Sequence, residues 1–527
     1  MDINHIVDSP FRALPRGDQD APALSIDGTE WWSYADLRDR RDRYIKVLLD
    51  AGVTPADRVG MILVNCLDYV ALYFAIARIG AIAVRLNFRL APAELSFLVE
   101  DSGSTVVFFH SSRTQQLEPI HEDLSVRSWF CLRDDETAVP EWAQAPDLDS
   151  PADGIDDLPR PSGADPVMIM YTSGTTGRPK GAVWTHDNAM WFATIQAMQW
   201  GFTRRTVTMT TGPLYHAGAF ECFTLPALMV YGRAVIMSSG GMSAQRIADT
   251  IAAAQVSDAL LYPFLIYDLL ALGPDRLRTL GSLKLVMSGG DPLQAWAIEA
   301  LTEHLPNVEL NKGFGLTEGG GQSAVLTQEF SRSHADTVGR PLPLTEIRVV
   351  GIDGSDTAPD EVGEIWVRSP AVSGVYWNRP EATKETFVDG WCRTGDLGRV
   401  TSDGFLLVSG RSKDMIRSGG ENIYPAEIEG VLARHPDVGA VAVVAVPDSK
   451  YLEVGCAVVV PADDDKPQDE LESALREWAA THLARYKCPR HYVFVDELPV
   501  SPSGKVLKRV LRDTYASAQV AAEAATP

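Results

Sequence analysis

The sequence lacks any arrangement of cysteines that would indicate a disulfide framework or a metal centre. Its six cysteines are scattered over 527 residues and never form a Cys-x-x-Cys pair, the spacing typical of zinc sites and redox motifs. Dispersed single cysteines are common in proteins of reducing compartments. We therefore predict a cytoplasmic protein without a cysteine-bound metal.

The sequence also lacks an excess of positive charge. It has 47 lysine and arginine residues against 70 aspartate and glutamate residues, so the formal net charge is -23 at pH 7 and the pI is near 4.8. Because binding to a phosphate backbone requires a basic surface, we expect no nucleic-acid partner. The charge says nothing of the oligomeric state, and a homodimer stays open.

Long apolar runs are absent as well. No run approaches the roughly 18 residues that a membrane-spanning helix needs. The first stretch, MDINHIVDSPFRALPRGD, has no basic start followed by an apolar core, so it does not match a secretory signal. We therefore expect no integral membrane segment.

Short apolar runs and amphipathic segments alternate over most of the chain. Ser33 with Asp36 three positions later predicts a helix start, and Gly52 predicts its end. The pattern then predicts strands over 58–65, 81–86 and 104–109 and helices over 66–80 and 91–103. This alternation is typical of an α/β fold with a largely parallel sheet covered on both faces. The length predicts at least two domains, and the tail from Thr514 is expected to fray.

A loop rich in Thr, Ser and Gly lies in the stretch YTSGTTGRPKGAVWTH, which begins at Tyr171. It connects an apolar run, 166–171, to a helical pattern at 185–198. Two residues separate Gly177 from Lys180, whereas a Walker A loop places the glycine and lysine side by side. A loop that leaves a sheet and enters a helix favours anion binding by backbone N–H groups. A solvated Ser/Gly linker is the alternative.

This loop resembles the phosphate loop of the adenylate-forming superfamily, which includes acyl-CoA synthetases, peptide-synthetase adenylation domains and firefly-type luciferases. Later motifs resemble the superfamily in the same order: GFGLTEGG from Gly313, GWCRTGDLGRV from Gly390, GRSKDMIRSGGENIYPAEIE from Gly410 and LPVSPSGKVLKRVLR from Leu498. Together they extend the resemblance over essentially the whole chain. It implies a large N-terminal domain of layered sheets with flanking helices, 1–412, and a small mobile α+β C-terminal domain, 413–527.

The resemblance implies two successive half-reactions. A carboxylate attacks the α-phosphorus of MgATP to give acyl-AMP and pyrophosphate, and the thiol of CoA then takes the acyl group. The implied small molecules are therefore a carboxylic acid, ATP and CoA, with Mg2+ as the metal. The loop would hold the β- and γ-phosphates as a leaving group.

The nucleotide site is implied residue by residue. Phe314 would stack on adenine, Asp396 would accept the ribose hydroxyls and Arg411 would place a cation near ribose or phosphate. Thr317 would bond the α-phosphate and Glu318 would hold Mg2+. Without the resemblance, GFGLTEGG fits a glycine-rich turn with one surface acid equally well. The implied ATP-binding residues are Thr172, Ser173, Gly174, Thr175, Thr176, Gly177, Lys180, Ser288, Gly289, Gly290, Gly313, Phe314, Gly315, Asp396 and Arg411.

The acid site is expected around His216, although a lone His in an apolar stretch is more often a core residue. The segments near it offer no obvious cation or carboxylate pair for a second charge, so a hydrophobic acid is favoured over an amino acid. The glycines that follow Glu318 would leave room for a fatty, aromatic or alicyclic acyl group. The expected acyl pocket is His216, Ala217, Gly218, Gly319 and Gly320.

Lys505 in SPSGKVLKR is the implied catalytic cation, because it would stabilise the charge that builds in the transition state. The expected catalytic residues are Lys505, Thr317, Glu318 and His216. The small domain would turn about Lys413, and pantetheine would pass along Ser418, Gly419 and Gly420. The chain departs from the superfamily at Leu452, where glycine is common.

Three functions stay open on these grounds. The leading one is an acyl-CoA synthetase for a hydrophobic acid. A second is an acyl-AMP enzyme that passes its acyl group to an amine or a carrier protein. A third is a non-catalytic nucleotide-binding protein, although such a protein would not need Lys505.

Overall fold

The computed structural model describes residues 1–15, 17–133, 137–172, 179–289, 293, 295–411, 414–418, 421–448, 450–462, 467–500 and 506–524. The chain divides into two compact units, Met1–Ile347 with Trp366–Thr394, and Arg348–Ile365 with Gly395–Pro527. The expected domain boundary after residue 412 stays a prediction. Each unit is described below by itself.

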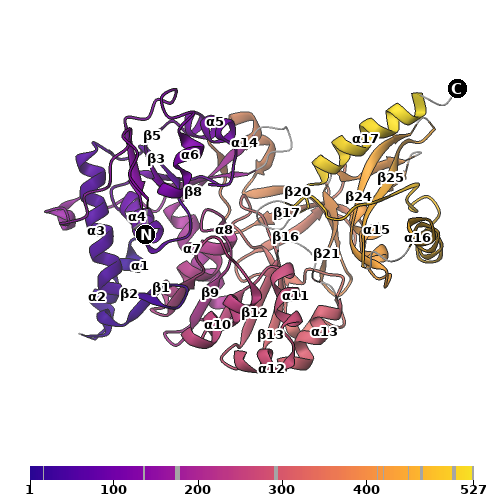
Figure 1. Cartoon of the computed structure of the whole chain (residues 1–527), viewed down its shortest axis with the longest axis horizontal. Coiled ribbons are helices and arrows are strands. Elements are labelled where there is room, and N and C mark those ends of the chain that lie inside the picture. Colours follow the sequence, from indigo (N-terminus) through magenta and orange to yellow (C-terminus); the bar gives the residue numbers. More distant parts are fainter. Residues whose placement is uncertain are drawn as a thin grey trace. The chain divides into compact units, whose positions relative to one another are not determined.

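The first unit is built on sheets whose inner strands are parallel, which confirms the α/β prediction (Figure 1). One sheet runs in the order β15 (Arg340–Pro341), β14 (Ala324–Leu326), β13 (Glu309–Phe314), β12 (Leu285–Gly289), β11 (Asp258–Leu260), β9 (Val207–Thr210), β10 (Arg233–Ile236), β1 (Pro22–Ile26) and β2 (Glu30–Ser33). Another runs in the order β18 (Val375–Tyr376), β8 (Lys180–Thr185), β7 (Pro166–Thr172), β4 (Ile82–Arg85), β3 (Arg58–Ile62), β5 (Ser104–His110) and β6 (Ser128–Leu132). Antiparallel pairs occur toward the edges, for example β1 with β2 and β7 with β8.

Helices cover these sheets. They are α1 (His5–Asp8), α2 (Pro10–Ala13), α3 (Tyr34–Asp50), α4 (Leu67–Arg78), α5 (Pro92–Ser102), α6 (Thr114–Leu117), α7 (His186–Trp200), α8 (Ala217–Ala219), α9 (Leu225–Met229), α10 (Ala244–Ala254), α11 (Pro263–Ala271), α12 (Pro274–Leu277), α13 (Ala295–His304) and α14 (Pro380–Thr386). The predicted capping box starts α3, since Ser33 Oγ accepts the Asp36 N–H at 3.0 Å. Every residue of α4 except Asp68 is buried, because α4 contacts β4 of one sheet and β1 of the other.

The strands bury both of their faces. In β5, Val106 and Phe108 belong to the large core that the sheets of this unit share. Val107 and Phe109 point the other way, into a second core that α5 covers. Side chains alternate between faces along a strand, so a strand buried on both sides is apolar at nearly every position.

The phosphate-loop segment differs from the expectation in one respect. The sequence predicts that the loop enters a helix directly, but it connects β7 to β8, which pair as antiparallel strands. The apolar residues before Thr185 extend far enough to pair with β7, and α7 begins only after them. Thr185 caps α7 by accepting the Asn188 N–H at 3.1 Å. Residues 173–178 of the loop lie outside the described residues.

A smaller sheet has the order β16 (Glu346–Val350), β17 (Gly363–Arg368), β20 (Trp391–Val400) and β19 (Phe387–Val388), and β21 (Leu406–Arg411) pairs with β20. The division between the units falls within β16, β17 and β20.

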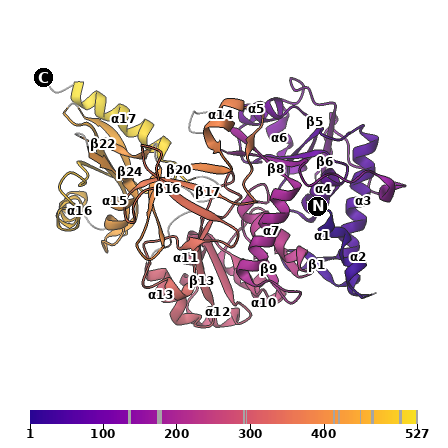
Figure 2. The ribbon, with the colours of Figure 1, turned by 180° about the vertical axis from the view of Figure 1, so that it is seen from behind.

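In the second unit a further sheet has the order β23 (Glu421–Ile423), β22 (Ile416–Ser418), β25 (Leu452–Pro461) and β24 (Val438–Asp448), and β26 (His491–Phe494) pairs with β25. Its helices are α15 (Pro425–Leu432), α16 (Gln468–His482) and α17 (Lys508–Ala524). Both views of the ribbon show α15 and α17 on opposite sides of β24 (Figures 1 and 2). Val443 packs with α15 and α16, whereas Val444 packs with Leu511 of α17. This arrangement is an α+β domain, as predicted.

The C-terminal segment is more regular than the sequence suggested. Fraying is expected from Thr514, but α17 continues to Ala524. The tail is rich in alanine, the strongest helix former, and buried Leu511 anchors the helix on the sheet. Among the residues that the structure describes, no helix is long and apolar enough to cross a membrane.

Candidate active site

Three segments of the first unit meet at the carboxylate of Glu318. Thr172, the last residue of β7, donates its hydroxyl to Glu318 Oε1 at 2.7 Å. Tyr376 of β18 donates its phenol to the same oxygen at 2.8 Å. Burial and the neighbouring Glu318 raise the pKa of Tyr376, so its hydroxyl stays protonated and remains a donor. The structure thus brings two predicted residues together and adds Tyr376, which the sequence interpretation missed.

The charges around this carboxylate suit a divalent cation with phosphates. The ammonium of Lys180 lies 5.4 Å from the centre of the Tyr376 ring, so a cation and an anion flank the same phenol. Within the described ranges, no group of three or more His, Cys, Asp or Glu side chains is placed to hold a metal. Mg2+ usually binds to one or two carboxylates together with substrate phosphates. The single buried carboxylate of Glu318 fits that mode of binding.

A brace around Asp101 holds the strands that carry this cluster. The Tyr171 hydroxyl donates to Asp101 Oδ2 at 2.8 Å, and Arg379 pairs with Oδ1. Trp377 Nε1 donates to the Asp101 carbonyl at 3.2 Å. Tyr171 precedes Thr172 and Trp377 follows Tyr376, so the brace fixes both hydroxyl donors. The signal for it in the sequence is weak: one Tyr-Trp pair shortly before a proline.

The expected adenine-side residues also meet. Gly289 pairs with Gly313 and Ser288 pairs with Lys312, because β12 and β13 are parallel neighbours. A Cβ at Gly289 would stand 3.0 Å from the Gly313 carbonyl oxygen, so this approach requires glycine. Phe314 ends β13 at the same edge. Ligands of open α/β sheets bind at the carboxyl ends of the strands, where these residues lie.

The turn after Phe314 is folded back on itself. Gly321 N–H bonds to the Leu316 carbonyl at 2.9 Å, and Trp184 Nε1 donates to the Thr317 carbonyl at 3.1 Å. A Cβ at Gly320 would stand 2.8 Å from that of Ala371. Close packing by itself therefore accounts for a glycine here, and the part of Gly319 and Gly320 in an acyl pocket stays a prediction.

His216 lies at the start of the short helix α8. Its Nδ1 accepts the Gly218 N–H at 3.1 Å, and the residue is exposed, so it is not a core histidine. Ala217 is buried and Gly218 is half-buried beside it. His216, Ala217 and Gly218 thus lie together at this helix start, and their part in an acyl pocket stays a prediction.

In the second unit, Asp396 and Arg411 face each other on adjacent strands. Arg411 Nε lies 2.7 Å from Asp396 Oδ1, and β20 and β21 place the two residues directly opposite. The Asp396 side chain is 7% exposed. The guanidinium holds the carboxylate in place, which suits a group that must accept hydrogen bonds in a fixed direction.

At Leu452, where the sequence differs from the superfamily, the backbone also has an unusual conformation. Leu452 has a φ of 76°, a left-handed conformation that glycine adopts without steric cost, and it is 70% exposed. It pairs with Ser418 of β22, the first residue of the expected CoA path.

The expected residues that lie outside the described ranges are Ser173, Gly174, Thr175, Thr176, Gly177, Gly290, Lys413, Gly419, Gly420 and Lys505.

Comparison with known proteins identifies the family. A family model described as AMP-binding enzyme matches residues 11–377, and one described as AMP-binding enzyme C-terminal domain matches residues 427–505. The chain belongs to the AMP-binding enzymes. This confirms the adenylate-forming superfamily that the motifs indicated.

Several AMP-binding enzymes are similar to this chain over most of its length. It is 37% identical to a feruloyl-CoA synthase of Amycolatopsis sp. over 92% of this chain and 94% of the relative. It is 33% identical to the long-chain-fatty-acid–CoA ligase FadD13 of Mycobacterium tuberculosis over 92% and 93%. The crystal structure of ATP-bound MatB from Rhodopseudomonas palustris matches with a TM-score of 0.84 and 29% identity, and covers 98% of this chain and 99% of that one.

Proposed function

We propose that this AMP-binding enzyme is an acyl-CoA synthetase for a hydrophobic carboxylic acid. An oxygen of the acid attacks the α-phosphorus of ATP, the bond to the β-phosphate breaks, and pyrophosphate leaves. The CoA sulfur then attacks the acyl carbon, AMP leaves, and the thiol proton passes to solvent. The relatives named for feruloyl and long-chain fatty acids support an acid with a large apolar part.

The observation that carries the proposal is the meeting of Thr172, Glu318 and Tyr376. Glu318 would hold Mg2+, which when bound offsets the charge of the phosphates. Tyr376 and Thr172 orient the carboxylate through a shared acceptor oxygen. Thr172 is also the first residue of the proposed phosphate loop. The proposed metal ligand Glu318 therefore bonds to a residue of the loop that would bind the leaving group.

Each half-reaction would use further residues. Asp396 and Arg411 would bind the ribose, and Lys505 would stabilise the charge shared by the attacking carboxylate and the α-phosphate. His216 would border the acid. The second half-reaction would require the small domain to turn about Lys413, so that CoA reaches the acyl-AMP along Ser418 and the two glycines that follow it.

The test is acid-dependent release of AMP and pyrophosphate, measured with aliphatic, aromatic and alicyclic acids, with and without CoA. We expect AMP and thioester to form in equal amounts with at least one hydrophobic acid. The Glu318→Gln variant tests the proposed metal ligand, because it keeps the size of the side chain and loses the charge. It should slow pyrophosphate release at least about tenfold, a barrier increase of about 1.4 kcal/mol.

The alternatives give different products. AMP release that depends on an added amine or carrier protein, and not on CoA, would replace the CoA acceptor and leave adenylation intact. ATP binding without acid-dependent pyrophosphate release would contradict an enzyme altogether and favour a nucleotide-binding protein.

A further inference from the structure

A buried ion pair connects β4 to the segment that carries His216. Arg85, at the carboxyl end of β4, contacts Glu221 in the π-helix η4 (Phe220–Thr224), and their side chains are 0% and 1% exposed. Arg85 Nη2 also donates to the Leu214 carbonyl, and its Nε donates to the Tyr69 hydroxyl at 3.0 Å. One guanidinium therefore bonds to three separate parts of the first unit.

Arg85 thereby holds the chain on both sides of His216. Leu214 precedes the histidine, Glu221 follows it, and both bond to the same guanidinium. Asn65, which follows the neighbouring strand β3, adds a contact by accepting the Leu214 N–H at 2.8 Å. Side chains from the ends of adjacent parallel strands thus fix the backbone path through the proposed acid site.

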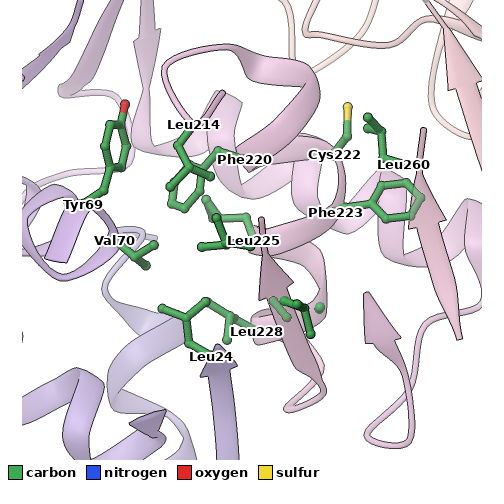
Figure 3. Close-up of a cluster of buried hydrophobic side chains, with 14 of the residues drawn as sticks. Leu24, Tyr69, Val70, Leu214, Phe220, Cys222, Phe223, Leu225, Leu228 and Leu260 are labelled. Carbon is green, nitrogen blue, oxygen red and sulfur yellow. The ribbon is translucent and has the colours of Figure 1, made fainter. Parts of the chain in front are cut away.

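Stability alone does not account for this pair. The other oxygen of the Glu221 carboxylate is buried and has no hydrogen-bond partner within the described part of the chain. A buried ion pair seldom adds stability over apolar side chains of similar size, even when it is fully hydrogen-bonded. The surroundings are apolar: Figure 3 shows Leu214 and Phe220 of this segment opposite Tyr69 of α4. The π-helix that carries Glu221 is also a rare element that is frequent at functional sites.

We propose that Arg85 and Glu221 are positioning residues for acid binding, which hold the segment 214–221 so that His216 stays in one place beside the acid. The inference rests on the proposed function. Because the two charges face each other, neither is left to pair with a second charge on the substrate.

The experiment compares the parent enzyme with the double variant Arg85→Met/Glu221→Leu, which replaces the pair by apolar side chains of similar volume. We expect this variant to fold, as apolar replacements of buried ion pairs often do. In assays of pyrophosphate release, KM for the acid should rise at least about tenfold, or about 1.4 kcal/mol, while KM for ATP stays within about twofold. A purely structural pair would not separate the two KM values.

A matched control is Arg41→Met/Asp8→Leu, which removes another buried arginine–carboxylate pair of the same unit, with side chains 1% and 10% exposed. Both KM values should stay within about twofold of the parent there. If the Arg85→Met/Glu221→Leu variant does not fold, Arg85→Lys serves instead. It keeps a cation opposite Glu221 but lacks the planar fork that reaches Leu214 as well, so KM for the acid should still rise at least about threefold.

The outcomes distinguish the positioning role of Arg85 and Glu221 from the proposed function. An active parent whose KM for the acid is unchanged in the folded variant overturns the positioning role and leaves the proposed function standing. A parallel rise of both KM values also overturns it. A parent that activates no acid contradicts the proposed function and the inference that rests on it.

Discussion

Replacing Tyr376 with phenylalanine should weaken the binding of Mg2+ without dismantling the site. The substitution removes one hydrogen bond to Glu318 Oε1 and leaves the ring, which packs beside Lys180 and against Phe387. A hydrogen bond to a charged group contributes about 1.5–3 kcal/mol. Losing a group that orients a metal ligand typically reduces metal affinity about 10- to 100-fold.

We therefore expect the Mg2+ concentration for half-maximal pyrophosphate release to rise at least about tenfold in Tyr376→Phe, which corresponds to about 1.4 kcal/mol. The titration is done at saturating acid with ATP held constant. Thr172 continues to bond to Glu318, so the rate at saturating Mg2+ should recover most of the parent value.

The control is Tyr34→Phe. Tyr34 is also buried, and its hydroxyl donates to the Gly232 carbonyl at 2.7 Å, away from the site. Tyr34→Phe should lose about 1 kcal/mol of unfolding free energy in urea denaturation, and Tyr376→Phe about 1.5–3 kcal/mol, because only Tyr376 donates to a charged group. Only Tyr376→Phe should change the Mg2+ requirement. If the two variants show the same Mg2+ curve as the parent, Tyr376 does not orient a metal ligand.

Four further predictions concern other parts of the chain. Lys505→Ala should slow adenylation about a hundred- to a thousandfold, or about 3–4 kcal/mol, with ATP binding largely kept. Acid-dependent pyrophosphate exchange above about a third of the parent rate would exclude a catalytic role for Lys505. Asp396→Ala should weaken binding of ATP about tenfold and binding of a dideoxyribose analogue far less, and equal weakening would indicate damage to the fold. Burial lowers the pKa of His186 to about 4, so the native state binds fewer protons than the unfolded state between that value and about 6.5. Stability should therefore fall by up to about 3 kcal/mol as the pH drops through this window, and His186→Gln should flatten that part of a urea-denaturation pH profile. Leu452→Gly should raise the unfolding free energy by about 1 kcal/mol and Leu452→Ala should not; equal values for both variants would show that the backbone there is not strained.

Local features of the fold were predictable because they depend on neighbouring residues. The capping box of α3 requires only Ser33 and Asp36, and the strands β3, β4 and β5 follow from short apolar runs. The error at the phosphate loop has a local cause too. The run from Lys180 to Thr185 is short, and a short apolar run does not by itself distinguish a strand from the beginning of a helix.

Part of the candidate site was inferred from the sequence, and the roles of its residues stay predictions. The phosphate-loop residues, Glu318 and Asp396 were inferred from motifs, since each motif is a continuous stretch of sequence. Tyr376 and the brace at Asp101 were missed, because single residues in unremarkable stretches become relevant only through their contacts.

What the sequence by itself determined is the chemistry: an adenylate-forming chain, the order of its motifs, and the residue types available to phosphate, metal and acid. What only the tertiary structure decided is which distant residues share one place. Thr172 and Glu318 are 146 positions apart, and Arg85 and Glu221 are 136 apart. Their meeting depends on the order of strands in the sheets, which local periodicity does not encode. A buried carboxylate needs a cation or hydrogen-bond donors beside it. The partners of Glu318 and Glu221 come from distant parts of the sequence, so only the folded chain shows them.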